Sequence, residues 1–189
     1  FDAKRVALGV ETFVDCNSDL ACTKQRIDDG TARKSSGVVY DKLFVRHWDT
    51  WANGRLNRLF VSTLPQGKEP PLKTAILIGP DVIGDVPSKP FGDTSEFAWS
   101  PDGASLVVSV RNADRSEPWN TNFDLYRVAA NGKDPSRNLT EANKAWDTGP
   151  VFSTDGRTLY YRAMKRPGFE ADRFALMAMD IATGSSREL

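Results

Sequence analysis

The sequence has few of the residues from which catalytic and metal centres are commonly built. It contains one histidine, His47, and two cysteines among 189 residues, so no group of Cys and His has the spacing of a zinc site. It also lacks the G-x-S-x-G elbow of an α/β-hydrolase, a calcium loop and the Lys-Ser/Thr that would complete a phosphate loop in GPDVIGDV. We therefore expect no cofactor, no metal and no catalytic triad here, and we expect His47 to be structural.

Net charge and long apolar runs are also absent. The 25 Lys and Arg residues balance 25 Asp and Glu residues, which argues against nucleic acid or an anionic membrane as the main partner. No apolar run approaches the roughly 18 to 20 residues of a membrane span. The chain begins with Phe1 and both ends fall in strand-like runs. We therefore expect a fragment, in which a signal peptide would not be visible.

The clearest pattern is a turn that occurs twice, in FAWSPDGASLVV (97–108) and PVFSTDGRTLYY (150–161). Asp102 and Asp155 lie 53 residues apart. In SPDG, Pro101 sets φ for the first turn position and Gly103 accepts the positive φ that follows. A period near 50 residues, with strands on both sides of such a turn, is typical of a propeller blade.

Each repeat contains four short strand-like runs joined by tight turns, which predicts a four-stranded antiparallel meander. We assign one blade to residues 97–140 and a second to 141–189. A worn copy of the pattern at 2–7 and strand-like runs within 43–80 predict divergent blades in residues 1–80, followed by an inter-blade loop at 81–96. The predicted fold class is all-β, a partial β-propeller of about three to four blades.

A polar insertion at 15–35 interrupts the first of these regions, and we expect it to be partly helical around residues 24–28. It contains Cys16 and Cys22, six residues apart. They could close a short disulfide loop or remain as two free thiols. Because disulfides persist in exported proteins, the first alternative predicts a periplasmic or secreted protein.

The strand order predicts which loops share a face of the ring. Each strand reverses direction, so the loops opposite the two Asp-Gly turns lie together at the other face. Four candidate site residues should share or border this face: Glu96, Trp119, Asp147 and Glu170, together with Asp172 and Arg173. They could form a functional rim, because sites on such scaffolds are carried by loops. The alternative is that each is a solvated loop residue or takes part in packing between blades.

Several segments carry a family resemblance: WDTWANGRLNRLFV, EFAWSPDG, EPWNTNFDLY, NLTEANKAWDTGPVFSTDGRTLYYRAMKRPGFEADR and DIATG. They resemble the N-terminal propeller of bacterial peptidases of the prolyl oligopeptidase family, in the branch of acylaminoacyl-peptidases and dipeptidyl-peptidase-V-like enzymes. The resemblance implies that the propeller covers an α/β-hydrolase domain carrying Ser, Asp and His. In relatives, glutamates just before an inner strand hold the substrate ammonium, and Glu96 occupies such a position.

We therefore expect the non-catalytic, substrate-gating part of a serine exopeptidase that cleaves oligopeptides near their N-terminus. Its expected partners are oligopeptides and the hydrolase domain of the parent protein, which would release dipeptides or acylamino acids. A homodimer is another way to cover the two exposed faces of a half-ring. The competing hypothesis is a TolB-like propeller that binds protein partners and has no enzymatic activity.

Overall fold

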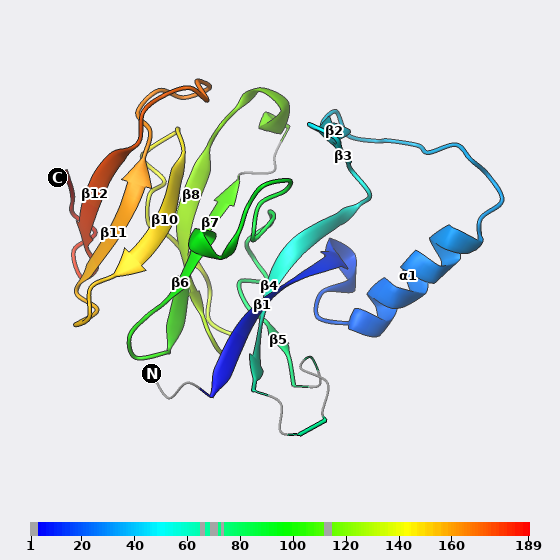
Figure 1. Ribbon diagram of the computed structural model, residues 1–189, viewed down its shortest axis with the longest axis horizontal. Helices are drawn as coiled ribbons and strands as arrows, with labels where there is room; N and C mark the ends of the chain where they lie inside the picture. Colours follow the sequence, from blue (N-terminus) through cyan, green and yellow to red (C-terminus); the bar gives the residue numbers. More distant parts are fainter. Residues whose placement is uncertain (1–3, 65–66, 69–71, 73, 112–114) are drawn as a thin grey trace.

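The computed structural model describes residues 4–64, 67–68, 72, 74–111 and 115–189. Its described part contains three sheets of three or four antiparallel strands and one two-stranded hairpin. Figure 1 shows the three larger sheets side by side, with the N-terminal and C-terminal sheets on the two outer sides. The helix α1 (Leu20–Ala32) stands apart from them.

Each of the two predicted repeats forms one four-stranded sheet, and the strands follow one another in chain order. The first sheet contains β6 (Phe97–Trp99), β7 (Ser105–Arg111), β8 (Phe123–Ala129) and β9 (Arg137–Asn138). The second contains β10 (Asp147–Phe152), β11 (Thr158–Ala163), β12 (Ala175–Asp180) and β13 (Ser186–Glu188).

The two Asp-Gly turns have the same local structure. In the first, the Ser100 hydroxyl and the Ala104 N–H both donate to Asp102 Oδ1, and Gly103 has φ of 68°. The second copy repeats these hydrogen bonds at Asp155. Each turn links two paired antiparallel strands, so the hairpins expected from the sequence are confirmed.

The first repeat is buried on both faces, which explains its nearly continuous apolar run SLVVSV. On one face of β7, Leu106, Val108 and Val110 pack against the N-terminal sheet. On the other face, Val107 packs with Leu125 and with Leu159 of the second repeat. A short apolar run without alternation is the pattern expected of a strand covered on both sides.

Residues 1–80 differ from the expectation of separate divergent blades. The strand β1 (Arg5–Phe13) pairs along its whole length with β4 (Arg55–Thr63), and the short β5 (Ile76–Leu77) completes one sheet. Residues 14–54 leave this sheet between β1 and β4, so the strand runs expected within 43–80 that form β4 and β5 complete the sheet of β1 rather than forming a blade of their own. Residues 2 and 3 of the predicted worn turn lie outside the described residues.

The insertion contains a 3-10 helix η1 (Val14–Cys16) and α1, which extends beyond the helical segment expected from the sequence. A disulfide joins Cys16 to Cys22, and Asp19 caps the helix by accepting from the Cys22 N–H. The guanidinium of Arg26 binds both carboxylate oxygens of Asp15, each at 2.7 Å. Among the described residues, no helix has the length and apolar character needed to cross a membrane.

Two further segments lie at the end of the sheets opposite the Asp-Gly turns. The strands β2 (Arg46–His47) and β3 (Thr50–Trp51) form the separate hairpin. The 3-10 helix η3 (Glu117–Trp119) lies between β7 and β8. Figure 1 shows β2, β3 and the loop that follows β11 at this same end.

Candidate functional site

Glu96 lies in the 3-10 helix η2 (Thr94–Glu96) just before β6, and its side chain is directed into the protein. It is only 6% exposed. Its Oε2 accepts the Ser88 backbone N–H and its Oε1 accepts the Ser88 hydroxyl, both at 2.6 Å. Burial raises the pKa of Glu96, and the two hydrogen bonds from Ser88 oppose this rise. The carboxylate therefore fixes the loop at 81–96 rather than facing solvent.

Asp147 is also internal, with 1% of its surface exposed. Its Oδ1 accepts a hydrogen bond of 2.9 Å from Asn143 Nδ2, whereas Oδ2 has no hydrogen-bond partner among the described residues. Burial raises the pKa of Asp147 to about 7, and the negative charge of Asp124 adds to the rise. Its carbonyl accepts from the Ser109 hydroxyl at 2.7 Å. Asp147 therefore belongs to the contact between the two repeats.

The structure brings the loops of Trp119 and Glu170 together. The Gly168 N–H donates to Thr121 Oγ1 at 3.1 Å, which joins the β11–β12 loop to the segment after η3. Trp119 is 65% exposed, and the Glu170 side chain is exposed and forms no hydrogen bond or ion pair with the described residues. Of the four predicted site residues, these two are therefore accessible on one surface.

The other two charged residues predicted for this rim have intramolecular partners. Asp172 accepts the backbone N–H groups of Lys165 and Arg166, each at 2.9 Å. These bonds, with the Arg166 guanidinium, lower the pKa of Asp172 to about 2. Arg173 forms an ion pair with Glu188 at 3.0 Å. Asp172 thus stabilises the β11–β12 loop, and Arg173 connects this loop to the edge strand β13.

The hairpin β2–β3 brings His47 close to this surface. Burial lowers the pKa of His47, and the Arg111 charge lowers it further, whereas the Glu170 charge raises it. The Arg111 guanidinium lies 5.1 Å from the Phe44 ring centre and donates to the Asn120 carbonyl at 2.9 Å. His47, Arg111 and Glu170 therefore lie within electrostatic range. In the sequence, the signal for Arg111 is that a charged residue follows directly after the apolar run of β7.

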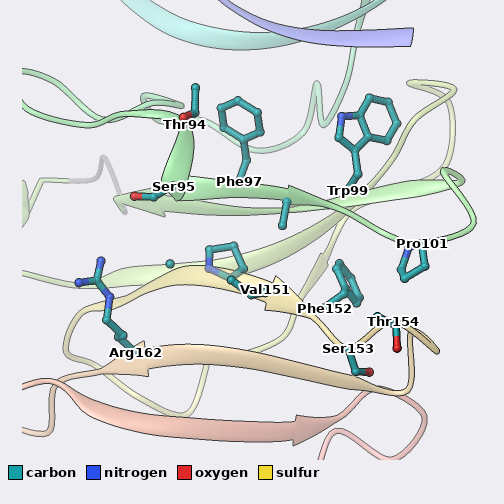
Figure 2. A pocket seen from close by; sticks show the side chains of 13 residues that line it. Thr94, Ser95, Phe97, Trp99, Pro101, Val151, Phe152, Ser153, Thr154 and Arg162 are labelled. Carbon is teal, nitrogen blue, oxygen red and sulfur yellow. The ribbon is translucent and has the colours of Figure 1, made fainter. Parts of the chain in front are cut away.

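A groove of about 580 Å³ lies between β6 and β10, the first strands of the two repeats. Figure 2 shows Arg162 extending from β11 toward these strands, on the side of the groove where Ser95 lies. The groove is lined by Thr94, Ser95, Phe97, Ala98, Trp99, Pro101, Gly149, Pro150, Val151, Phe152, Ser153, Thr154 and Arg162. The sequence did not single out this groove, because its residues come from separate strands.

The chain thus belongs to the all-β proteins built from repeated four-stranded antiparallel sheets, with an accessible loop surface at one end. No family model matches the sequence. It is 29% identical over 157 residues to dipeptidyl-peptidase 5 of Porphyromonas gingivalis, which covers 80% of this chain and 22% of that protein. It is 31% identical over 159 residues to a probable dipeptidyl-peptidase 5 of Aspergillus terreus, covering 77% and 22%.

A third relative, dipeptidyl-peptidase 5 of Porphyromonas endodontalis, is 32% identical over 147 residues, covering 77% of this chain and 20% of that protein. The chain therefore spans about a fifth of the length of these relatives. The similarity includes most of this chain, so it is not limited to the common Asp-Gly turn.

Proposed function

We propose that this chain is a non-catalytic β-propeller part of a serine dipeptidyl peptidase of the prolyl oligopeptidase family. The observation that carries the proposal is the similarity to proteins named dipeptidyl-peptidase 5 over about 80% of the chain and 22% of their length. The chain itself has one histidine and no G-x-S-x-G elbow. The Ser, Asp and His of the reaction would therefore lie in another part of the protein.

A comparison of the two repeats supports the propeller. Val107 and Leu125 are fully buried because the second repeat covers them. Their counterparts in the second repeat are Tyr160 and Leu176, which are 42% and 61% exposed. Equivalent apolar positions are thus covered in one repeat and open in the next. A further sheet on this face would bury them and continue the ring.

We assign peptide gating to the loop surface that contains Trp119, Glu170 and the β2–β3 hairpin. Its aromatic side chains offer apolar contact area, since Trp48 and Trp119 are 72% and 65% exposed. Glu170 offers a carboxylate free to bind an ammonium through a charge-assisted hydrogen bond. We therefore place the anchor for the peptide amino terminus at Glu170 rather than at Glu96, whose oxygens are bonded to Ser88.

The disulfide supports an exported protein, periplasmic or secreted. The bond between Cys16 and Cys22 links η1 to the first turn of α1. Such bonds persist in oxidising compartments and are rare in the cytosol of mesophiles. Locating the protein by fractionation, with the oxidation state of the two cysteines measured in each fraction, tests this part of the proposal.

The function is tested with the complete protein that contains this chain. It is incubated with a free-amine hexapeptide and with its N-acetylated form, and the products are separated by mass spectrometry. The proposal predicts release of dipeptides from the free-amine peptide only. Release of an acetylated amino acid would indicate an acylaminoacyl-peptidase. No cleavage of either peptide would contradict the proposal and favour the TolB-like scaffold. The exposed Trp48 and Phe91 would then be candidates for contact with a protein partner.

A further inference from the structure

The side chain of Arg162 starts on β11 and passes a β-bulge in the neighbouring strand β10 to reach the groove between β6 and β10. The pairing of β10 with β11 shifts register between Thr148 and Val151. Gly149 lies in this bulge with φ of 65°, and a Cβ there would lie 3.0 Å from Arg162 Nε. Bulges commonly redirect a side chain next to a functional site. Here the bulge and the missing side chain leave room for the guanidinium.

The guanidinium has strong unused hydrogen-bonding capacity. The side chain of Arg162 makes no hydrogen bond and no ion pair with the residues that the structure describes, and its guanidinium carbon lies 5.1 Å from the centre of the Phe174 ring. Its charge lowers the pKa of Asp93, although hydrogen bonds from Ser95 contribute more to that shift. An arginine has five N–H donors arranged to bind a carboxylate at two points. The donors of Arg162 are available for such a ligand.

The comparison of the two repeats shows that this arrangement is specific to the second one. At a spacing of 53 residues, Arg162 corresponds to Ser109 and Gly149 corresponds to Glu96. Ser109 is fully buried and its hydroxyl binds the Asp147 carbonyl of the neighbouring sheet. Arg162 is longer than this structural position requires, and it extends past β10.

The surroundings of Arg162 define the kind of ligand. Thr94 and Ser95 contribute polar residues to the lining of the groove, and Pro150, Val151 and Phe152 contribute apolar ones. A groove that combines a cation, polar residues and apolar residues fits a carboxylate attached to an apolar group. We propose that Arg162 binds the C-terminal carboxylate of a short oligopeptide, with its last apolar side chain in the groove. This inference rests on the proposed function, because it assigns a binding site to the C-terminal end of the peptide substrate.

The test uses the complete protein and the peptide Ala-Ala-Leu-Leu as its free acid and as its C-terminal amide. Binding is measured by calorimetry on protein treated with a fluorophosphonate, so that hydrolysis does not interfere. We expect the acid to bind about tenfold more tightly than the amide, as for one charge-assisted bidentate contact. Arg162→Met should reduce this ratio to about one by weakening the binding of the acid alone.

Two further variants distinguish the site from a general loss of structure. Gly149→Ala keeps the charge but places a methyl group against Arg162, so it should also reduce the acid-to-amide ratio. Arg157→Met removes an exposed arginine of the opposite turn, beside Asp155, and should leave the ratio unchanged. Equal binding of acid and amide by the unaltered protein would overturn the inference, and so would an unchanged ratio in Arg162→Met.

The binding ratio and the peptidase activity are separate readouts. If the acid-to-amide preference depends on Arg162 but no dipeptide is released by untreated protein, the carboxylate site stands and the proposed peptidase function fails. If dipeptides are released and the preference is absent, the proposed function stands and the Arg162 site is refuted.

Discussion

Replacing Asp147 by Asn should change how the stability of the protein depends on pH. The carboxyl group is 1% exposed, and burial raises its pKa from 3.8 to about 7. Because the folded state holds this proton more tightly than the unfolded state, the stabilising contribution of Asp147 is greatest at acidic pH. It is lost as the pH rises through about 7. The amide in Asp147→Asn has no proton to lose in this range, so the variant should lack this dependence.

The size of the effect follows from the two pKa values. Each unit of pKa difference corresponds to about 1.4 kcal/mol. For a folded-state pKa of about 7 and an unfolded value of 3.8, the contribution at pH 5 exceeds that at pH 8 by about 3 kcal/mol. This value is a ceiling, because relaxation around a charged Asp147 would reduce it. The Asn side chain can still accept the hydrogen bond from Asn143.

The assay is urea unfolding at pH 5 and pH 8, followed by tryptophan fluorescence, since Trp146 is the neighbouring residue. The free energy of unfolding of Asp147→Asn, minus that of the unaltered protein, should be higher at pH 8 than at pH 5 by up to about 3 kcal/mol. Asp134→Asn, at an exposed turn of the first repeat, is the control and should show no such change. A difference that is identical at the two pH values would refute the assignment of a raised pKa to Asp147.

Three other predictions concern the peptide anchor, the sheet faces and the disulfide. In the complete protein, Glu170→Gln should raise KM for free-amine peptides about tenfold with little change in kcat; an unchanged KM would exclude Glu170 as the amine anchor. Leu125→Ala should lower the free energy of unfolding by about 2 to 5 kcal/mol. Leu176→Ala should approach that cost in the complete protein if a further sheet covers it; a cost under about 0.5 kcal/mol would mean that the face stays open. Cys22→Ser should increase hydrogen exchange in α1 and leave exchange in β7 unchanged, and a uniform increase in exchange would contradict a local role for the disulfide.

The hairpins could be predicted from the sequence because their turns depend on local residues. SPDG and STDG require only their own serine, aspartate and glycine side chains, and both turns have the expected hydrogen bonds. The pairing of β1 with β4 could not be predicted in the same way. It brings together strands separated by a long insertion, and no turn signal connects them.

The accessible surface was predicted only in part, because burial depends on contacts between distant segments. Trp119 and Glu170 lie in loops that leave the sheets, so strand order was sufficient to place them together. Asp147 looked like part of a loop, but β10 begins at this residue, four positions before the apolar Val151 that marked the strand in the sequence. Arg162 alternates regularly within β11, and only the bulge at Gly149 explains its path to the groove.

The most direct test of the proposed function is to locate the reactive serine in the complete protein. The protein is treated with a fluorophosphonate, digested, and searched by mass spectrometry for the modified peptide. We predict one modified serine outside residues 1–189, with loss of dipeptide release in proportion to its modification. Modification of a serine within residues 1–189, or full dipeptide release after complete modification, would contradict a non-catalytic role for this chain.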